Sequence, residues 1–466
     1  MTYTADARFT KGSLMWHVSA MSFTTSIALM AIYAVDLLDL LFISRLGYEQ
    51  MAAAGYAGAL MFFGSAFNIG LSVAAGALVS RELGAGNVDA ARDYATSVAV
   101  RAVFVGIVLP LAVLPNLTFL LGLVGATGGS LALAKTYMWI ILPATAFSGL
   151  SMTAVAVIRA HGDGRTAMYP ALAGAGVNAV MDPVLIFALG LGLEGAAWAT
   201  VLARLATMLW ALYPAIWRYN AFSWPRLRVL KRDFNQSARI AVPAILAAVA
   251  TPIGTAIITR EMAKYGTGAV AGMTVINRMT PVVFAVVLAL SGAIGPIIGQ
   301  NFGARRLDRV RESFFDGLVF VAVYVVVAAA LLFGLRAPIA EVFGATGEAH
   351  ALIYLYCGPL ALAMFFNGAI YVANAAFNNL GHPAYSTLVD LGRNTLGTWP
   401  LAVLGGAYFG PEGVLIGQAA GGALFAACAT WLALHVIRGP ATGIIKRPHF
   451  RFYDRRMMAL CHRCNR

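Results

Sequence analysis

Four polar side chains lie within apolar stretches of this 466-residue sequence, where ionisable groups are costly. Asp36 and Asp39 are about one helical turn apart in one stretch, and Asn178 and Asp182 have i, i+4 spacing in another, so each pair shares a helix face. If the two stretches meet, the carboxylates repel each other in a low dielectric. Such a pair would take up a proton or bind Na⁺ through oxygen ligands, and either chemistry could couple the protein to an ion gradient.

The residue that follows Asp182 also favours an ion-binding role for this part of the helix. Pro183 cannot donate a backbone hydrogen bond, so we expect the helix to loosen there and to free a carbonyl group for a ligand. The seven histidines lie in loops, tails or helix ends, and they offer no competing proton relay.

The composition predicts the surroundings of these side chains. Apolar residues make up 60% of the chain and charged residues 11%, with a mean hydropathy of +0.76. Soluble proteins carry about 25% charged residues, so a soluble enzyme is excluded. The formal charge of +13 would suggest nucleic acid in a soluble protein, but in a membrane protein it reports topology. We expect the lipid bilayer, and no nucleic acid, as a partner.

Twelve segments are long and apolar enough to span a bilayer, which takes about 20 residues as a helix. The first is expected to be an integral span and no signal peptide to be removed. The sequence therefore predicts an all-α polytopic membrane protein. The segments are roughly 14–44, 51–80, 95–120, 131–158, 168–189, 195–217, 238–259, 268–298, 313–335, 348–376, 384–406 and 412–437.

The basic residues orient these spans. Of the 33 Lys and Arg residues, 25 lie in the termini, the central linker and alternate loops on one side, and five lie at the opposite ends. Because cytoplasmic loops retain positive charge, we expect a multi-pass protein of the plasma (inner) membrane with both termini in the cytoplasm.

The chain repeats itself at a shift of 219 residues. The tetrapeptide Gly125–Gly128 maps onto Gly344–Gly347, and Gly162 maps onto Gly381 in the same register. Each half therefore holds six helices, and an even number makes the lobes parallel, related by a pseudo-two-fold along the membrane normal. The predicted parts are an N-terminal lobe (1–218), a cytoplasmic linker (219–237), a C-terminal lobe (238–437) and a basic cytoplasmic tail (438–466).

The repeat supplies an internal control for the polar cluster. At the same shift, the second copy has none of the four side chains. The residues at the matching positions are Thr255, Ile258, Gly397 and Leu401. If the cluster held a six-helix lobe together, both copies would need it. Its presence in one copy favours a functional role.

Four other charged side chains lie at membrane depth, and the sequence indicates a structural role for only two of them. Asp390 and Arg393 have i, i+3 spacing, which predicts an ion pair within one helix. Arg204 and Arg278 have no assigned partner. In the tail, Cys461 and Cys464 form half of a possible zinc site, and His462 does not complete it. No catalytic residues and no metal centre are predicted.

Several of these stretches resemble the multidrug and toxic compound extrusion (MATE) family. The first-helix run VDLLDLLFISRLG (35–47) resembles the family signature, in which an Asp precedes the Gly of Arg-Leu-Gly by eight residues. RAHGDG (159–164), NAVMDPVLIF (178–187) and GQNFGARRLDRVRE (from 299) also resemble it. The match covers nearly all of the chain to about residue 437 and is closest to the archaeal and DinF-like branch.

That resemblance implies a cation site in the amino-terminal lobe. The branch uses two Asp residues, an Asn, a Thr and a Tyr, and the matching positions are Asp39, Asp182, Asn178, Thr200 and Tyr137. The sequence departs from the branch in two respects: Asp36 is an extra acid, and the first helix lacks a proline near its start. The second-lobe acids of the other branch have no clear counterparts.

The expected function is cation-coupled antiport that exports amphipathic or cationic organic compounds by alternating access, with H⁺ or Na⁺ as the coupling ion. The alternative is a lipid-linked saccharide flippase of the same superfamily, which commonly has a strongly cationic cavity, whereas only three basic residues remain inside here. A membrane enzyme would need a nucleophile with a His partner or a metal cluster at depth. The expected partners are small organic substrates, and the expected state is a monomer.

Overall fold

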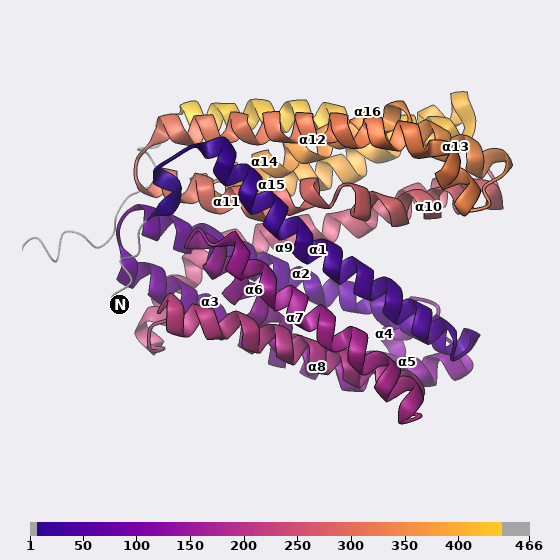
Figure 1. Cartoon of the computed structure of the whole chain (residues 1–466), viewed down its shortest axis with the longest axis horizontal. Coiled ribbons are helices and arrows are strands. Elements are labelled where there is room, and N and C mark those ends of the chain that lie inside the picture. The colour runs from indigo at the N-terminus through magenta and orange to yellow at the C-terminus, as the bar shows by residue number, and fades with distance from the viewer. Residues whose placement is uncertain (1–6, 440–466) are drawn as a thin grey trace, which may run out of the picture.

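The computed structural model describes residues 7–439, and every regular element in that range is helical (Figure 1). The predictions for Cys461, Cys464 and the basic tail beyond residue 439 concern residues outside this range. The first half of the chain forms α1 (Leu14–Ser44), α2 (Tyr48–Gly84), α3 (Val88–Val113), α4 (Leu117–Leu123), α5 (Gly128–Ile141), α6 (Thr145–Ala160), α7 (Gly164–Pro183) and α8 (Gly192–Tyr213). The second half forms α9 (Leu227–Ala263), α10 (Thr267–Val283), α11 (Ala285–Gly303), α12 (Leu307–Val342), α13 (Gly347–Cys357), α14 (Met364–Leu380), α15 (Pro383–Gly392) and α16 (Thr398–Arg438).

The number of spans agrees with the prediction. Within residues 7–439, ten helical stretches are long and apolar enough to cross a membrane, or eleven when the bent pair α5 and α6 counts as one span. The last stretch, 383–438, folds back on itself at Phe409 and Gly410, whose backbone is not helical. Gly405 and Gly413 pack backbone to backbone across this turn. With that stretch counted as two, the eleven spans become twelve.

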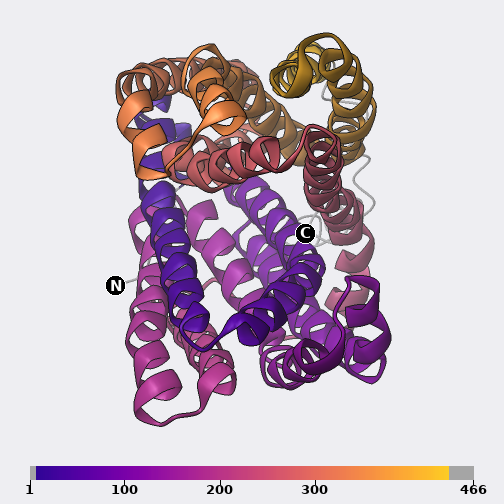
Figure 2. The same cartoon turned by 90° about the vertical axis from the view of Figure 1, so that its right-hand side faces the viewer.

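The two halves of the chain form two lobes, which separate in both views (Figures 1 and 2). Helix α1 runs across the boundary, since it packs against α7 of its own lobe and against α11 of the other. Phe9 and Leu14 are buried in the same apolar core as α11 and α14. The beginning of the first lobe is therefore fixed in the core of the second.

The lobes touch at one end and diverge at the other. Gly84 at the end of α2 lies against the backbone of Gln300, and Gly303 lies against the backbone of Arg81, so closely that a Cβ atom at either glycine would collide. At the opposite end, α4 and α5 lie far from α10 and α13 (Figure 1). The structure is thus closed at the end that holds residues 81–84 and 300–303.

One amide side chain connects the lobes at the closed end. Gln300, fully buried on α11, accepts a hydrogen bond from Phe9 N at 2.9 Å and donates one to the carbonyl of Ala160 on α6 at 2.7 Å. Arg309 Nη2 donates to the carbonyls of Phe9 and Gly12, at 3.1 and 3.0 Å. These bonds hold the segment before α1 on the second lobe and tie both to α6.

The helix α9 begins at Leu227, inside the segment 219–237 that the sequence marks as a linker. Its first turns dock on α3 of the first lobe: Ser97 donates to Asp233 Oδ2 at 2.9 Å, and Arg101 donates to the Leu230 carbonyl at 2.7 Å. The charged part of the linker is therefore a helical extension of the first span of the second lobe.

Candidate functional site

The acids Asp39 and Asp182 come together inside the first lobe, because α1 packs along α7. The two carboxylates interact electrostatically, and Asp182 is fully buried. Oδ1 of Asp39 and Oδ2 of Asp182 are buried and have no hydrogen-bond partner in the described part of the chain. A buried carboxylate oxygen without a partner is costly unless a proton or a cation satisfies it.

Asn178 lies one turn before Asp182 on α7. Its Nδ2 donates to Asp182 Oδ1 at 3.4 Å, so one carboxylate oxygen is held by the protein and the other is left for a ligand. Helix α7 ends at Pro183 and continues as a π-helical turn over Val184–Ala188. This change confirms that the helix loosens after Asp182, as Pro183 predicts.

Tyr137 and Thr200, which only the family resemblance had suggested, lie beside the acids. Tyr137 on α5 is 8% exposed, hydrogen-bonds with Thr200 of α8 and interacts electrostatically with Asp39 and Asp182. The Thr200 hydroxyl donates its one proton to the carbonyl of Ala196 at 3.0 Å, so it accepts from Tyr137. The structure therefore brings five of the six predicted side chains into one cluster built from α1, α5, α7 and α8.

A basic residue accompanies this cluster. Arg204 lies one turn after Thr200 on α8, where it interacts electrostatically with Tyr137 and donates from Nη1 to the carbonyl of Ile141 at 3.2 Å. The i, i+4 spacing from Thr200 is a signal in the sequence that could have placed Arg204 here. The cluster thus holds two carboxylates and one guanidinium.

Asp36 lies outside the buried cluster. Its side chain is exposed, although it still interacts electrostatically with Asp39 one turn away. It also lies near Tyr33, which in turn interacts with Tyr371 of the second lobe. Of the two acids on α1, Asp39 is half-buried and has one buried carboxylate oxygen, whereas Asp36 is exposed.

The predicted ion pair between Asp390 and Arg393 does not form as a direct contact, although the two charges still attract each other electrostatically. No nitrogen of Arg393 lies within 4.0 Å of a carboxylate oxygen in the described range 7–439, and α15 changes to a π-helical turn at Arg393. Asp390 Oδ2 instead accepts from Asn374 Nδ2 of α14 at 2.9 Å, and Arg393 hydrogen-bonds with Tyr371. Each charged side chain has a neutral partner on α14.

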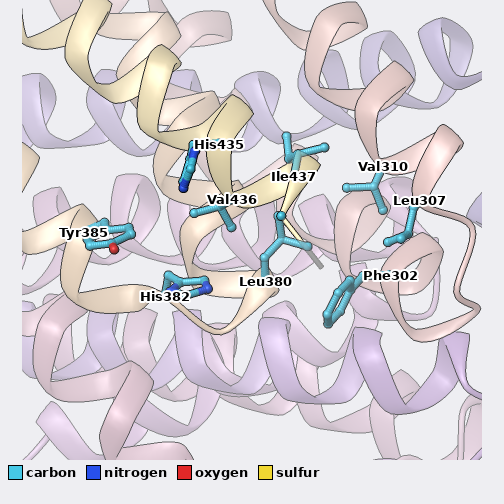
Figure 3. Close-up of a pocket in the computed structure, with 10 residues that line it drawn as sticks. Phe302, Leu307, Val310, Leu380, His382, Tyr385, His435, Val436 and Ile437 are labelled. Carbon is cyan, nitrogen blue, oxygen red and sulfur yellow. The ribbon is translucent and has the colours of Figure 1, made fainter. Parts of the chain in front are cut away.

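Two hollows lie outside these clusters. A groove of about 710 Å³ lies between Phe62 of α2 and residues 251–263 of α9, and its mostly apolar lining includes Thr255 and Arg260. A smaller pocket of about 260 Å³ lies in the second lobe, where His382 and His435 are among its lining residues (Figure 3). No acidic side chain lines either hollow.

Twelve spans in two lobes, with a buried pair of acids in one of them, define a polytopic membrane protein of the carrier class. The family model described as MatE matches residues 25–184 and 243–404 of the chain. The chain belongs to this family, the MATE transporters.

Relatives of known name and structure agree with that membership. The chain is 29% identical over 408 residues to a FAD transporter of Shewanella oneidensis, covering 85% of this chain and 89% of the relative. It is 24% identical over 360 residues to the multidrug export protein MepA of Staphylococcus haemolyticus, covering 76% and 78%. The structure of the Vibrio cholerae MATE transporter VcmN in the bent form superposes with a TM-score of 0.86 at 24% identity, covering 91% and 97%.

Proposed function

We propose that this MATE transporter is a cation-coupled antiporter that exports amphipathic or cationic organic compounds by alternating access, in exchange for H⁺ or Na⁺. The observation that carries the proposal is the pair of buried carboxylate oxygens without partners on Asp39 and Asp182. They come from two helices of one lobe, and the repeat gives Ile258 and Leu401 at the matching positions of the other.

The chemistry of the pair explains how an ion would act on the conformation. With both acids ionised, two negative charges share a poorly solvated space, and they repel each other. A proton or Na⁺ would remove that repulsion and allow α1 and α7 to pack more closely. The conformation with the tighter cluster therefore binds the ion more strongly, and the ion gradient biases the equilibrium between the two conformations.

The neutral side chains fit either coupling ion. The Asn178 Oδ1 atom and the hydroxyl groups of Thr200 and Tyr137 offer oxygen ligands for Na⁺ beside the two carboxylates, and the same carboxylates accept H⁺. Gradients of H⁺ and of Na⁺ that are imposed separately therefore distinguish the two ions.

We also propose the orientation of the protein. The closed end carries Arg81, Arg305, Arg306 and Arg309, and basic residues favour the cytoplasmic side. Both termini would then be cytoplasmic in the inner membrane, and the structure would be open to the outside. Because one chain holds both lobes, we expect it to act as a monomer.

A second substrate class has support from one relative. The Shewanella protein, similar along 85% of this chain, is a FAD transporter. A flavin dinucleotide is amphipathic, with aromatic rings and a diphosphate, and it is therefore a candidate substrate besides multidrug compounds.

Export from everted vesicles tests the proposal. We expect Asp39→Asn and Asp182→Asn to abolish export of a fluorescent amphipathic cation while the proteins remain folded. Tyr356→Phe is the matched control, since Tyr356 is the repeat mate of Tyr137 and bonds to Thr280 at 2.6 Å in the other lobe. Full export by both Asn variants would refute the assignment.

A further inference from the structure

We propose that the second lobe holds a separate solute-binding site, made by Arg393, Tyr371, Asp390 and Asn374, for a compound that carries both an anionic oxygen group and a hydrogen-bond donor. The site is distinct from the acid cluster of the first lobe. The inference rests on the proposed transport function only in taking the bound solute to be transported.

The first observation concerns the separation of the two charges. The i, i+3 spacing of Asp390 and Arg393 favours pairing in a regular helix, yet no Asp390 oxygen lies within 4.0 Å of an Arg393 nitrogen in the part of the chain that is described. A π-helical turn over Arg393–Gly397 begins at Arg393 itself. Such turns frequently occur at functional sites.

The second observation concerns hydrogen-bonding capacity. Arg393 has five N–H donors, and its side chain interacts with the hydroxyl group of Tyr371 and, without direct contact, with the Asp390 carboxylate. A carboxylate or phosphate could accept from the remaining donors, and its charge would compensate the guanidinium directly.

The third observation points to a donor on the ligand. Asn374 uses Nδ2 to hold Asp390 at 2.9 Å, but its Oδ1 is buried without a partner within residues 7–439. A buried amide oxygen without a donor is costly. An N–H or O–H group of a bound compound would satisfy it, beside a carboxylate that also favours a donor.

The fourth observation is the position of the site in the fold. Tyr371 interacts with Tyr33 of α1, so the site borders the first lobe. Asn394, next to Arg393, lies against Gly254 of α9, and Thr255 on the same helix lines the groove between α2 and α9. The site is therefore linked, through the contact of Asn394 with Gly254, to the helix that lines the groove between the lobes.

The repeat shows that the site is not needed to build a lobe. At the shift of 219 residues, the first lobe has apolar residues in place of all four side chains, with Met152, Val155, Ala171 and Gly174. Each lobe thus carries one polar cluster that the other lacks, acidic in the first lobe and of mixed charge in the second.

Binding of three matched probes to the purified full chain in neutral detergent, without an ion gradient, tests the site. The probes are 4-aminobenzoate, which has the anion and the donor, benzoate, which has only the anion, and aniline, which has only the donor. We expect 4-aminobenzoate to bind most tightly. Arg393→Gln should weaken both carboxylates by about tenfold, because a charge-assisted bond is lost.

Variants separate the roles of the side chains. Asn374→Ala should remove the preference for 4-aminobenzoate over benzoate, whereas Tyr356→Phe, elsewhere in the second lobe, should leave binding unchanged. If Arg393→Gln does not elute as a single species, Arg393→Lys replaces it, with binding about threefold weaker because bidentate geometry is lost. Unchanged carboxylate affinity in the folded Arg393 variant, or aniline binding as tightly as 4-aminobenzoate, would overturn the proposal.

A competition experiment with a lipid distinguishes binding of a solute from binding of a lipid headgroup. Short-chain phosphatidylglycerol should not displace 4-aminobenzoate, and displacement that depends on Arg393 would overturn the assignment to a solute. The assay contains no gradient and uses no first-lobe acid. Its failure therefore differs from a failure of the proposed antiport, which would appear as full export by the Asp39 and Asp182 variants.

Discussion

Asn178 Nδ2 donates a hydrogen bond to Asp182 Oδ1 at 3.4 Å, while the other oxygen of the same carboxylate is buried without a partner. Stability and function therefore make opposite demands on Asp182. Asp182→Asn removes a buried charge and keeps an acceptor for Asn178, so the thermal midpoint in detergent should stay the same or rise, by the equivalent of about 1 kcal/mol.

Asn178→Ala is the counterpart of that variant. It leaves the Asp182 carboxylate without its donor, and the midpoint should fall by the equivalent of about 1–2 kcal/mol. A midpoint that falls for Asp182→Asn and holds for Asn178→Ala would show that the carboxylate stabilises the fold, contrary to the account.

The bridge at Gln300 predicts a conformational effect. Gln300→Ala removes one bond to Phe9 and one to Ala160, which together contribute about 1–3 kcal/mol to the closed end. The population open at that end should therefore rise by roughly 5- to 150-fold. Spin labels at Thr127 and Thr346, just before α5 and α13, should report a new, shorter distance.

Gln50→Ala is the control for this measurement, because Gln50 lies on α2 and packs near Gly47 within one lobe. Its distance distribution should match that of the unaltered chain. If the Gln300 variant also matches, the amide does not hold the closed end.

The hydrogen bonds of Asp163, which caps the start of α7, predict that stability depends on pH. Burial would raise the pKa of Asp163 between α6 and α7, but bonds from Thr166 N at 2.9 Å and Tyr219 Oη at 2.6 Å, with Arg218 at 3.4 Å, lower that pKa below 3.8. The stabilisation is therefore present above about pH 4 and is lost as the pH falls through the folded-state pKa.

Asp163→Asn should accordingly lower the thermal midpoint at pH 7.5, by the equivalent of about 1 kcal/mol for a weakened cap. The difference from the unaltered chain should shrink as the pH approaches the folded-state pKa of Asp163. A difference that stays constant from pH 7.5 to pH 3 would contradict this explanation.

The sequence predicts the fold and the acids of the first lobe because both depend on features within single segments of the chain. Apolar length determines the spans, and the i, i+4 spacing of Asn178 and Asp182 puts both on one face of α7. The meeting of Asp39 with Asp182 needs the packing of α1 on α7, which the sequence supported only through the missing acids of the second copy. Tyr137 and Thr200 came from the family resemblance, since neither residue type is unusual in an apolar helix.

The failures have equally specific causes. The pairing of Asp390 with Arg393 assumed that no other side chain competes, whereas Asn374 donates to Asp390 and Tyr371 interacts with Arg393. The helical start of α9 at Leu227 was missed because polarity was used to delimit the span. Arg and Lys form helices well when tertiary bonds such as Ser97 to Asp233 support them.

The most direct test of the account is efflux from proteoliposomes in which a pH gradient and a Na⁺ gradient are imposed separately. The account predicts that one of the two gradients drives substrate export by the unaltered chain. It further predicts that neither gradient drives export by Asp39→Asn or Asp182→Asn, although both variants still bind the substrate. Export by both variants at the full gradient-driven rate would contradict it.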